Sequence, residues 1–154
     1  MCSMHGILFI VNDRCDVAMA VGASGVHLGD GDLPLDVARK VLGARKILGV
    51  SSHSVRQALR LSRGKPDYLA VGPVFESHTK ITARKLLGAR TVAQIAGKVA
   101  CPVVAIGGID SHNARALMQA GASAIAVVGA IGRAKNPQRA TRLLVKSLRE
   151  GESR

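Results

Sequence analysis

Residues 119–129 read "QAGASAIAVVG", and residues 20–29 read "AVGASGVHLG". Both stretches run from a helix-like segment through a Gly-Ala-Ser turn into an apolar run, and "RGKPDYLAVG" at residues 63–72 is a looser third copy. Each has the pattern of a joint at which a helix returns the chain to the next parallel strand. The recurrence therefore predicts a sheet built from repeated strand and helix units.

Six short apolar runs follow one another along the chain, and the segments between them have apolar residues spaced three and four apart, as amphipathic helices do. Continuously apolar strands are typical of a parallel sheet covered by helices. The runs are "ILFIV" (7–11), "GVHL" (25–28), "KILGV" (46–50), "YLAV" (68–71), "PVVAI" (102–106) and "AIAVV" (124–128).

This rhythm predicts an α/β fold of the (β/α) TIM-barrel type, with about six of the usual eight units in a single domain over residues 1–154. An open doubly wound sheet remains the alternative, because strand order cannot be read from periodicity. An incomplete barrel would also leave two strand edges without a partner.

Composition narrows the class of protein. Hydrophobic residues make up 47% of the 154 residues, but only two Phe and one Tyr are aromatic, so the core must consist of Val, Ile, Leu and Ala. No apolar stretch approaches the roughly 20 residues of a membrane span, and the first residues lack the basic leader of a signal peptide. Three widely spaced cysteines argue against a disulfide framework or zinc site, so we expect a cytoplasmic protein.

The net charge of +12 fits either nucleic acid or anionic small molecules as partners. The basic residues are dispersed over the polar faces of the helical segments, and Trp is absent, so no base-stacking platform is visible. We therefore expect small phosphorylated substrates and neither nucleic acid nor membrane, with a homo-oligomer left open. A basic nucleic-acid binder remains an alternative that rests on charge alone.

In a barrel the active site forms at the C-terminal ends of the strands. Polar residues or glycines follow each apolar run, and the densest group is "ESHTK" (76–80) after "VGPVF". Gly107-Gly108 and Gly129 follow the last two runs, where backbone amides could bind a phosphate. Glycines that merely allow tight turns are the alternative interpretation.

Asp13 and Asp32 follow the first two runs, and two carboxylates there could hold Mg²⁺ together with substrate phosphates. The alternative is helix capping, by Asp32 before Leu33-Pro34 and by Asp13 before Cys15. Lys80 is well suited to face a phosphate.

Two histidines, one after an apolar run and one within a run, also have both a structural and a functional interpretation. His53 in "SSHS" more often makes a hydrogen bond at a helix start than takes part in catalysis. His27 falls within an apolar run, so we expect a structural role for it.

At this point the chain resembles the thiamin phosphate synthase family, over about residues 7–145. The motifs "GVHLG..DLP", "GVS.HS" and "GP.F...TK" are specific to this synthase and its thiazole tautomerase relatives. The matching blocks, in the family's order and spacing, are "FIVNDRCDVA", "GVHLGDGDLP", "ILGVSSHS", "YLAVGPVFESHTK", "VVAIGGI" and "IAVVGAI".

The resemblance implies a transferase that joins 4-amino-2-methyl-5-pyrimidinylmethyl diphosphate to 4-methyl-5-(2-phosphoethyl)thiazole and releases pyrophosphate. It implies Asp13 and Asp32 as Mg²⁺ ligands, and Asn12 and Lys80 as groups that hold the departing diphosphate. Ser51 matches a serine near the reacting pyrimidine, so Ser51 and Lys80 are the expected catalytic residues. The family reaction is dissociative, which leaves charge neutralisation and orientation to the protein.

The same resemblance implies that Ser77 and Thr79 bind the thiazole phosphate, together with the amides around Gly108, Val128 and Gly129. Ser77 stands where threonine is usual, and Gly129 where serine is usual. The match lacks the family's first two βα units, with an arginine and a lysine that help to bind the diphosphate.

Two further readings stay open beside the synthase. A thiazole tautomerase-like enzyme would use His53 as an acid or base, although retention of Asp32 favours the synthase. A non-catalytic, truncated phosphate-binding barrel would explain the missing units, although retention of Asn12, Asp13, Asp32 and Lys80 argues against it.

Overall fold

The structure is a computed structural model, and it describes residues 2–77 and 84–149. It contains a single six-stranded sheet in which every neighbouring pair is parallel and the strand order follows the chain, β1-β2-β3-β4-β5-β6. A doubly wound sheet reverses its strand order at a switch point, so the open-sheet alternative is wrong. The strands are β1 (Ile10–Asn12), β2 (Gly25–Leu28), β3 (Ile47–Ser52), β4 (Tyr68–Val71), β5 (Val103–Ile106) and β6 (Ala124–Ala126).

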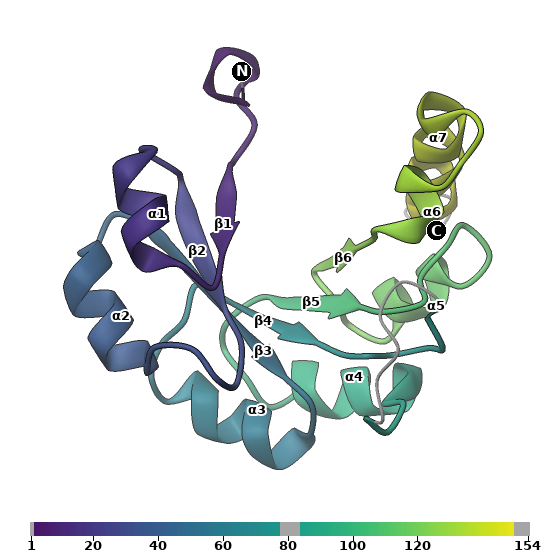
Figure 1. Cartoon of the computed structure of the whole chain (residues 1–154). Helices are drawn as coiled ribbons and strands as arrows, with labels where there is room; N and C mark the ends of the chain where they lie inside the picture. Colours follow the sequence, from purple (N-terminus) through teal and green to yellow (C-terminus); the bar gives the residue numbers. More distant parts are fainter. Residues whose placement is uncertain (1, 78–83, 150–154) are drawn as a thin grey trace.

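The sheet curls into a half-barrel with helices on its convex side (Figure 1). The hollow of the half-barrel is its concave side, which these helices leave uncovered. This arrangement confirms the prediction of a TIM-type barrel with about six βα units. A short 3₁₀ turn, η1 (Cys2–His5), precedes the sheet. The helices are α1 (Cys15–Ala20), α2 (Leu35–Leu42), α3 (Val55–Ser62), α4 (Gly88–Ala96), α5 (Ala114–Gln119), α6 (Gly129–Gly132) and α7 (Pro137–Arg149).

The core lies between the convex face of the sheet and the helices. Because side chains alternate along a strand, Val26 and Leu28 of β2 are buried beneath the helices, whereas His27 between them faces the hollow and is half-buried. Small residues bring the helices close to the sheet, since Ala18, Ala38 and others are fully buried. As predicted, aliphatic side chains and alanines make up nearly all of this core.

The two outer strands are shorter than their apolar runs. In the described part of the chain, β1 pairs only with β2, starting at Ile10 opposite Gly25, and β6 pairs only with β5, ending at Ala126 opposite Ile106. Residues 7–9 and 127–128 lie beyond these partners and are not strand. The predicted pair of exposed strand edges is confirmed, at β1 and β6.

Candidate active site

The C-terminal ends of the strands bring most of the sequence-predicted site residues to one rim of the hollow. Asn12 ends β1 and Asp13 follows it, with a φ of 66° that aspartate tolerates better than most residues. The Asp13 backbone N–H donates to the carbonyl oxygen of His27 at 2.8 Å, which ties this turn to β2. The Asn12 amide donates to Asp13 Oδ1 at 2.6 Å and so orients the carboxylate.

Asp32 is held by its own loop. The backbone N–H of Gly29, directly after β2, donates to Asp32 Oδ2 at 2.6 Å. The residue that precedes α2 is Pro34, and no side chain caps that helix; Arg14 precedes α1, again without a side-chain cap. Helix capping is therefore the wrong explanation for both Asp13 and Asp32, and their carboxylates are available for another purpose.

We tested on this geometry whether the two carboxylates suit a divalent cation. Asp13 Oδ2 and Asp32 Oδ1 accept no hydrogen bond from any described residue, and neither carboxylate forms an ion pair with a described cation. Within residues 2–77 and 84–149 there is no cluster of three or more His, Cys, Asp or Glu that would form a complete protein cage. Mg²⁺ typically takes one or two carboxylates and completes its shell with waters and substrate phosphates, so this donor set fits it.

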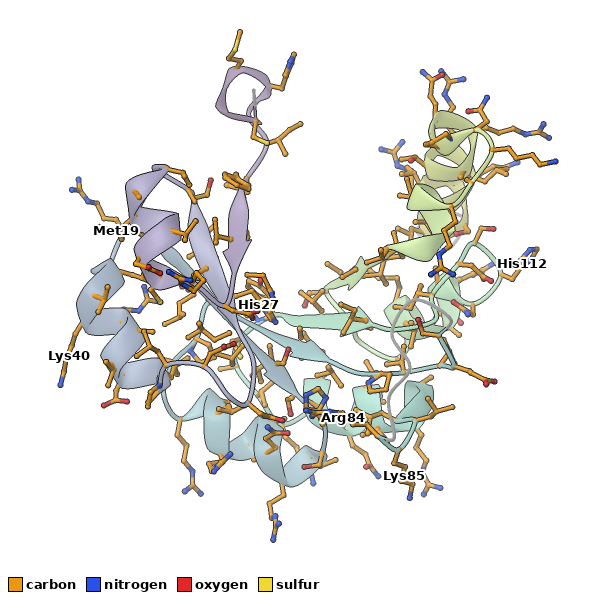
Figure 2. All side chains as sticks on the ribbon, in the orientation of Figure 1. Met19, His27, Lys40, Arg84, Lys85 and His112 are labelled. Carbon is orange, nitrogen blue, oxygen red and sulfur yellow. The ribbon has the colours of Figure 1, made fainter. Side chains whose placement is uncertain are left out.

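His27 lies between Ser51 and Tyr68 on the neighbouring strands. Its Nε2 lies 2.9 Å from Ser51 Oγ on β3, and its Nδ1 lies 3.0 Å from the Tyr68 hydroxyl on β4. The His27 and Tyr68 rings stack with centroids 5.5 Å apart, and Figure 2 labels His27 beside the hollow. Burial lowers the pKa of His27, and the Asp13 and Asp32 charges oppose that shift without reversing it. The contacts with Ser51 and Tyr68 hold the His27 ring between β3 and β4, and they orient the Ser51 hydroxyl.

The opposite half of the rim is built from backbone. Gly107 and Gly108 follow β5 with φ values of 100° and 65°, and the Gly108 carbonyl accepts from the Asn113 amide at 2.9 Å. A Cβ on Gly108 would lie 2.2 Å from the carbonyl oxygen of Glu76, because the loop after β4 packs directly on this turn. Glycine is therefore required here for close approach as well as for its φ.

Val128 and Gly129 lie at the start of α6, where first-turn amides have no partner within the helix. Val128 is 62% exposed. Ser77 is half-buried on the segment after β4. Thr79 and Lys80 lie outside the described residues, so the predicted grip of Lys80 on a phosphate stays a prediction.

Sequence reasoning missed one cluster. Asp30 lies 2.8 Å from Arg84 Nη1 and also accepts a hydrogen bond from Gln57, and His53 Nε2 lies 3.6 Å from its Oδ2. The hydrogen bond from Arg84 is the main reason that the pKa of Asp30 is lowered. Asp30 and Arg84 are 54 residues apart, so no local pattern could have paired them.

Comparison with known proteins decides the family. The family model described as thiamine monophosphate synthase matches residues 1–131. The chain belongs to the thiamine monophosphate synthase family. The thiamine-phosphate synthase of Chlorobium limicola is 43% identical over 150 residues, which cover 97% of this chain and 71% of that protein. A 45% identical thiamine-phosphate synthase of Parasynechococcus marenigrum is covered to 42% of its length.

Solved structures agree with this assignment. The thiamine phosphate pyrophosphorylase of Pyrococcus furiosus superposes with a TM-score of 0.88 at 38% identity, over 97% of this chain and 71% of that one. An orotidine 5'-phosphate decarboxylase from Pyrococcus horikoshii has a TM-score of 0.72 at 15% identity, which shows the fold alone.

As a family member this chain is a transferase of thiamine biosynthesis. No helix among the described residues could cross a bilayer.

Proposed function

We propose that this chain joins the pyrimidinylmethyl diphosphate to the thiazole phosphate at the rim described above, with release of pyrophosphate and with Mg²⁺ held by Asp13 and Asp32. One observation carries the proposal beyond family membership. Two carboxylates lie at the ends of adjacent strands, each with one oxygen held by a neighbour and the other without a described partner. Asp13 is exposed and Asp32 is half-buried, so a divalent cation brought in with a diphosphate can reach both remaining oxygens.

The side chains have separate tasks in this scheme. Bound Mg²⁺ would neutralise the diphosphate leaving group. Asn12 orients Asp13, and the Gly29 amide orients Asp32, so that neither carboxylate has to reorganise when ligand arrives. Ser51, held by His27, would orient the pyrimidine, and Lys80 would contact the diphosphate.

The thiazole phosphate would bind on the other side of the hollow. Ser77 and Thr79 would donate hydroxyls, and the amides near Gly108, Val128 and Gly129 would donate N–H groups. Because the two phosphorylated substrates would be held at opposite parts of one rim, the thiazole nitrogen would face the carbon that loses diphosphate. We place the reaction in the cytoplasm, the reducing compartment that suits three free cysteines.

The test is formation of thiamine phosphate by the purified chain, given both substrates and Mg²⁺, with detection by mass spectrometry. We expect product above the uncatalysed background, and we expect Asp32→Ala to remove it. Asp36→Ala is the matched control, because it deletes an exposed carboxylate four residues away, in the first turn of α2, without touching the rim. No product from a folded wild-type sample would refute the proposal and favour a non-catalytic phosphate-binding barrel.

A further inference from the structure

Asp30 connects the three loops that leave the C-terminal ends of β2, β3 and β4. It lies on the first of these loops and accepts a hydrogen bond from Gln57 at the start of α3. The same carboxylate accepts from Arg84 Nη1 at 2.8 Å, on the segment that leads into α4. Figure 2 labels Arg84 toward the lower side of the molecule, away from His27.

Each partner of Asp30 is itself anchored to the backbone. The Gln57 side-chain oxygen accepts from the His53 backbone N–H at 2.8 Å. His53 Nδ1 lies 2.5 Å from the carbonyl oxygen of Gly72, which can only accept, so this nitrogen carries the hydrogen. Through these partners, Asp30 is therefore connected to the backbone at the C-terminal ends of both β3 and β4.

The Arg84 end is fixed as well. Just beyond it, the Leu87 N–H donates to the Pro73 carbonyl at 2.9 Å, and the Gly88 N–H donates to the Val74 carbonyl at 3.0 Å. Arg84 thus extends toward Asp30 from a segment that returns to the point where β4 ends. The ion pair closes a connection between the loop that carries Asp32 and the segment that begins after β4.

We propose that Asp30 and Arg84 form a positioning pair, which holds the Asp32 loop in register with the end of β4 and the Ser77 segment. This inference rests on the proposed function in one respect, namely that Asp32 and Ser77 bind ligand. The coupling to Asp32 is direct, because the Gly29 N–H that precedes Asp30 donates to the Asp32 carboxylate. An exposed ion pair contributes little to folding, so loss of the pair should be visible at the site rather than in overall stability.

The sign of one effect separates positioning from simple electrostatics. Removing the positive charge of Arg84 should strengthen the binding of a nearby cation if charge alone matters. If Arg84 instead positions the Asp32 loop through Asp30, its removal should weaken cation binding. Arg84→Met is therefore the decisive variant, and Arg84→Lys, which keeps the charge, is the conservative rescue.

Arg39 offers a matched control. It forms an ion pair of the same kind with Asp67, at 2.6 Å and with similar exposure, but Asp67 precedes β4 and lies at the other end of the strands. Arg39→Met thus removes an exposed ion pair and an equal charge without touching the rim, together with the hydrogen bonds from Arg39 to the carbonyl oxygens of Gly43 and Lys46.

The experiment measures Mn²⁺ binding to the whole chain by electron paramagnetic resonance, together with KM for the thiazole phosphate and kcat. We expect Arg84→Met and Asp30→Asn to raise the Mn²⁺ Kd and the KM about three- to fivefold, the scale of one exposed ion pair. We expect kcat to change less than twofold, Arg84→Lys to restore most of the loss, and Arg39→Met to leave both constants unchanged. Circular dichroism verifies that each variant is folded.

Unchanged or tighter Mn²⁺ binding in Arg84→Met would overturn the inference, as would an equal effect of Arg39→Met. A wild-type chain that binds no Mn²⁺ would overturn it too. If the wild type binds Mn²⁺ and Arg84→Met weakens that binding, but no thiamine phosphate forms, the positioning pair stands and the proposed function fails. If the wild type forms thiamine phosphate but the variants keep its Mn²⁺ Kd and its KM, the proposed function stands and the positioning pair fails.

Discussion

The two halves of the rim present different kinds of polar group. The side-chain rim, consisting of Asn12, Asp13, Asp32 and Ser51, presents carboxylate, amide and hydroxyl groups that are oriented by hydrogen bonds to their neighbours. The backbone rim, consisting of Gly107, Gly108, Val128 and Gly129, presents main-chain groups at a tight turn and at a helix start.

The two halves therefore differ in how a substitution acts on them. On the side-chain rim a side chain can be exchanged while the backbone remains, so charge can be changed with little change in folding. On the backbone rim the groups proposed to bind ligand are main-chain atoms of the fold itself. Gly108 can hardly be altered without moving the loop after β4, whose carbonyl oxygen lies where a Cβ would be.

Asp13→Asn should have the largest effect, and it should lower the activity without lowering the stability of the fold. Asparagine also tolerates the positive φ at this position, so the turn after β1 should persist. Loss of one negative charge at the proposed Mg²⁺ site should lower kcat/KM about 100- to 1,000-fold, or about 3 to 4 kcal/mol in the barrier. Steady-state kinetics at several Mg²⁺ concentrations would measure it.

The urea unfolding midpoint of the Asp13→Asn protein serves as the control for that experiment. A midpoint that falls together with activity would show that Asp13 belongs to the fold, and the contrast between the two halves of the rim would then be lost.

Gly108→Ala should have the second largest effect, and this effect should be a loss of folding stability. The left-handed φ costs about 1 to 2 kcal/mol for a residue with a Cβ, and the clash with Glu76 and Phe75 backbone adds to that cost. We expect a loss of about 2 to 4 kcal/mol in the free energy of unfolding, measured by urea denaturation.

Gly97→Ala is the comparison for Gly108→Ala. Gly97 ends α4 with a φ of −72°, and an added Cβ would make only an ordinary contact with the Ala93 carbonyl oxygen at 3.4 Å. We expect Gly97→Ala to be nearly neutral. Equal effects of the two substitutions would show that the backbone rim is no more constrained than a helix end.

The smallest effect concerns pH and the His27 bridge beneath the side-chain rim. Burial lowers the pKa of His27 from its usual 6.5, so the unfolded chain takes up this proton before the folded chain does. The corresponding stability is fully present above 6.5 and is lost as the pH falls through the lower pKa of the folded state.

Urea unfolding of the metal-free chain between about pH 7.5 and pH 5 should therefore show declining stability, and His27→Gln should flatten that decline. His112→Gln removes an exposed imidazole in the loop between β5 and α5 as the control. A decline as steep in His27→Gln as in the wild type would assign the pH dependence to other groups.

Local pattern was enough for several parts of this molecule. The apolar runs predicted β2 and β4 with correct bounds, and the Gly-Ala-Ser joints predicted the parallel connections. Asn12 ends β1, and Asp13 and Asp32 follow β1 and β2, as expected. Ser51 lies within β3, one residue before its end, because this strand is longer than its apolar run. Parallel strands end at the same edge, so residues that end consecutive strands share a rim whatever the details of packing.

Other features depended on contacts between distant residues. Phe9 belongs to an apolar run but not to β1, because its N–H donates to the Ser24 side-chain hydroxyl instead of to a backbone carbonyl of the neighbouring strand. The capping interpretation of Asp32 was wrong because the nearby Gly29 amide, placed by the turn after β2, takes its carboxylate. The Gly29 amide and the start of α2 are both close to Asp32 in the sequence, so the sequence alone could not show which of them its carboxylate contacts.

Strand periodicity and chain order were enough to predict the parallel α/β architecture, the aliphatic core and the residues that line the rim. The folded structure was needed to show that His27 bridges Ser51 and Tyr68, that the loop after β4 packs on Gly108, and that Asp30 meets Arg84. The physical reason is that hydrogen bonds and ion pairs form between atoms within about 3 Å of one another, and curvature of the sheet brings together residues that chain order keeps far apart.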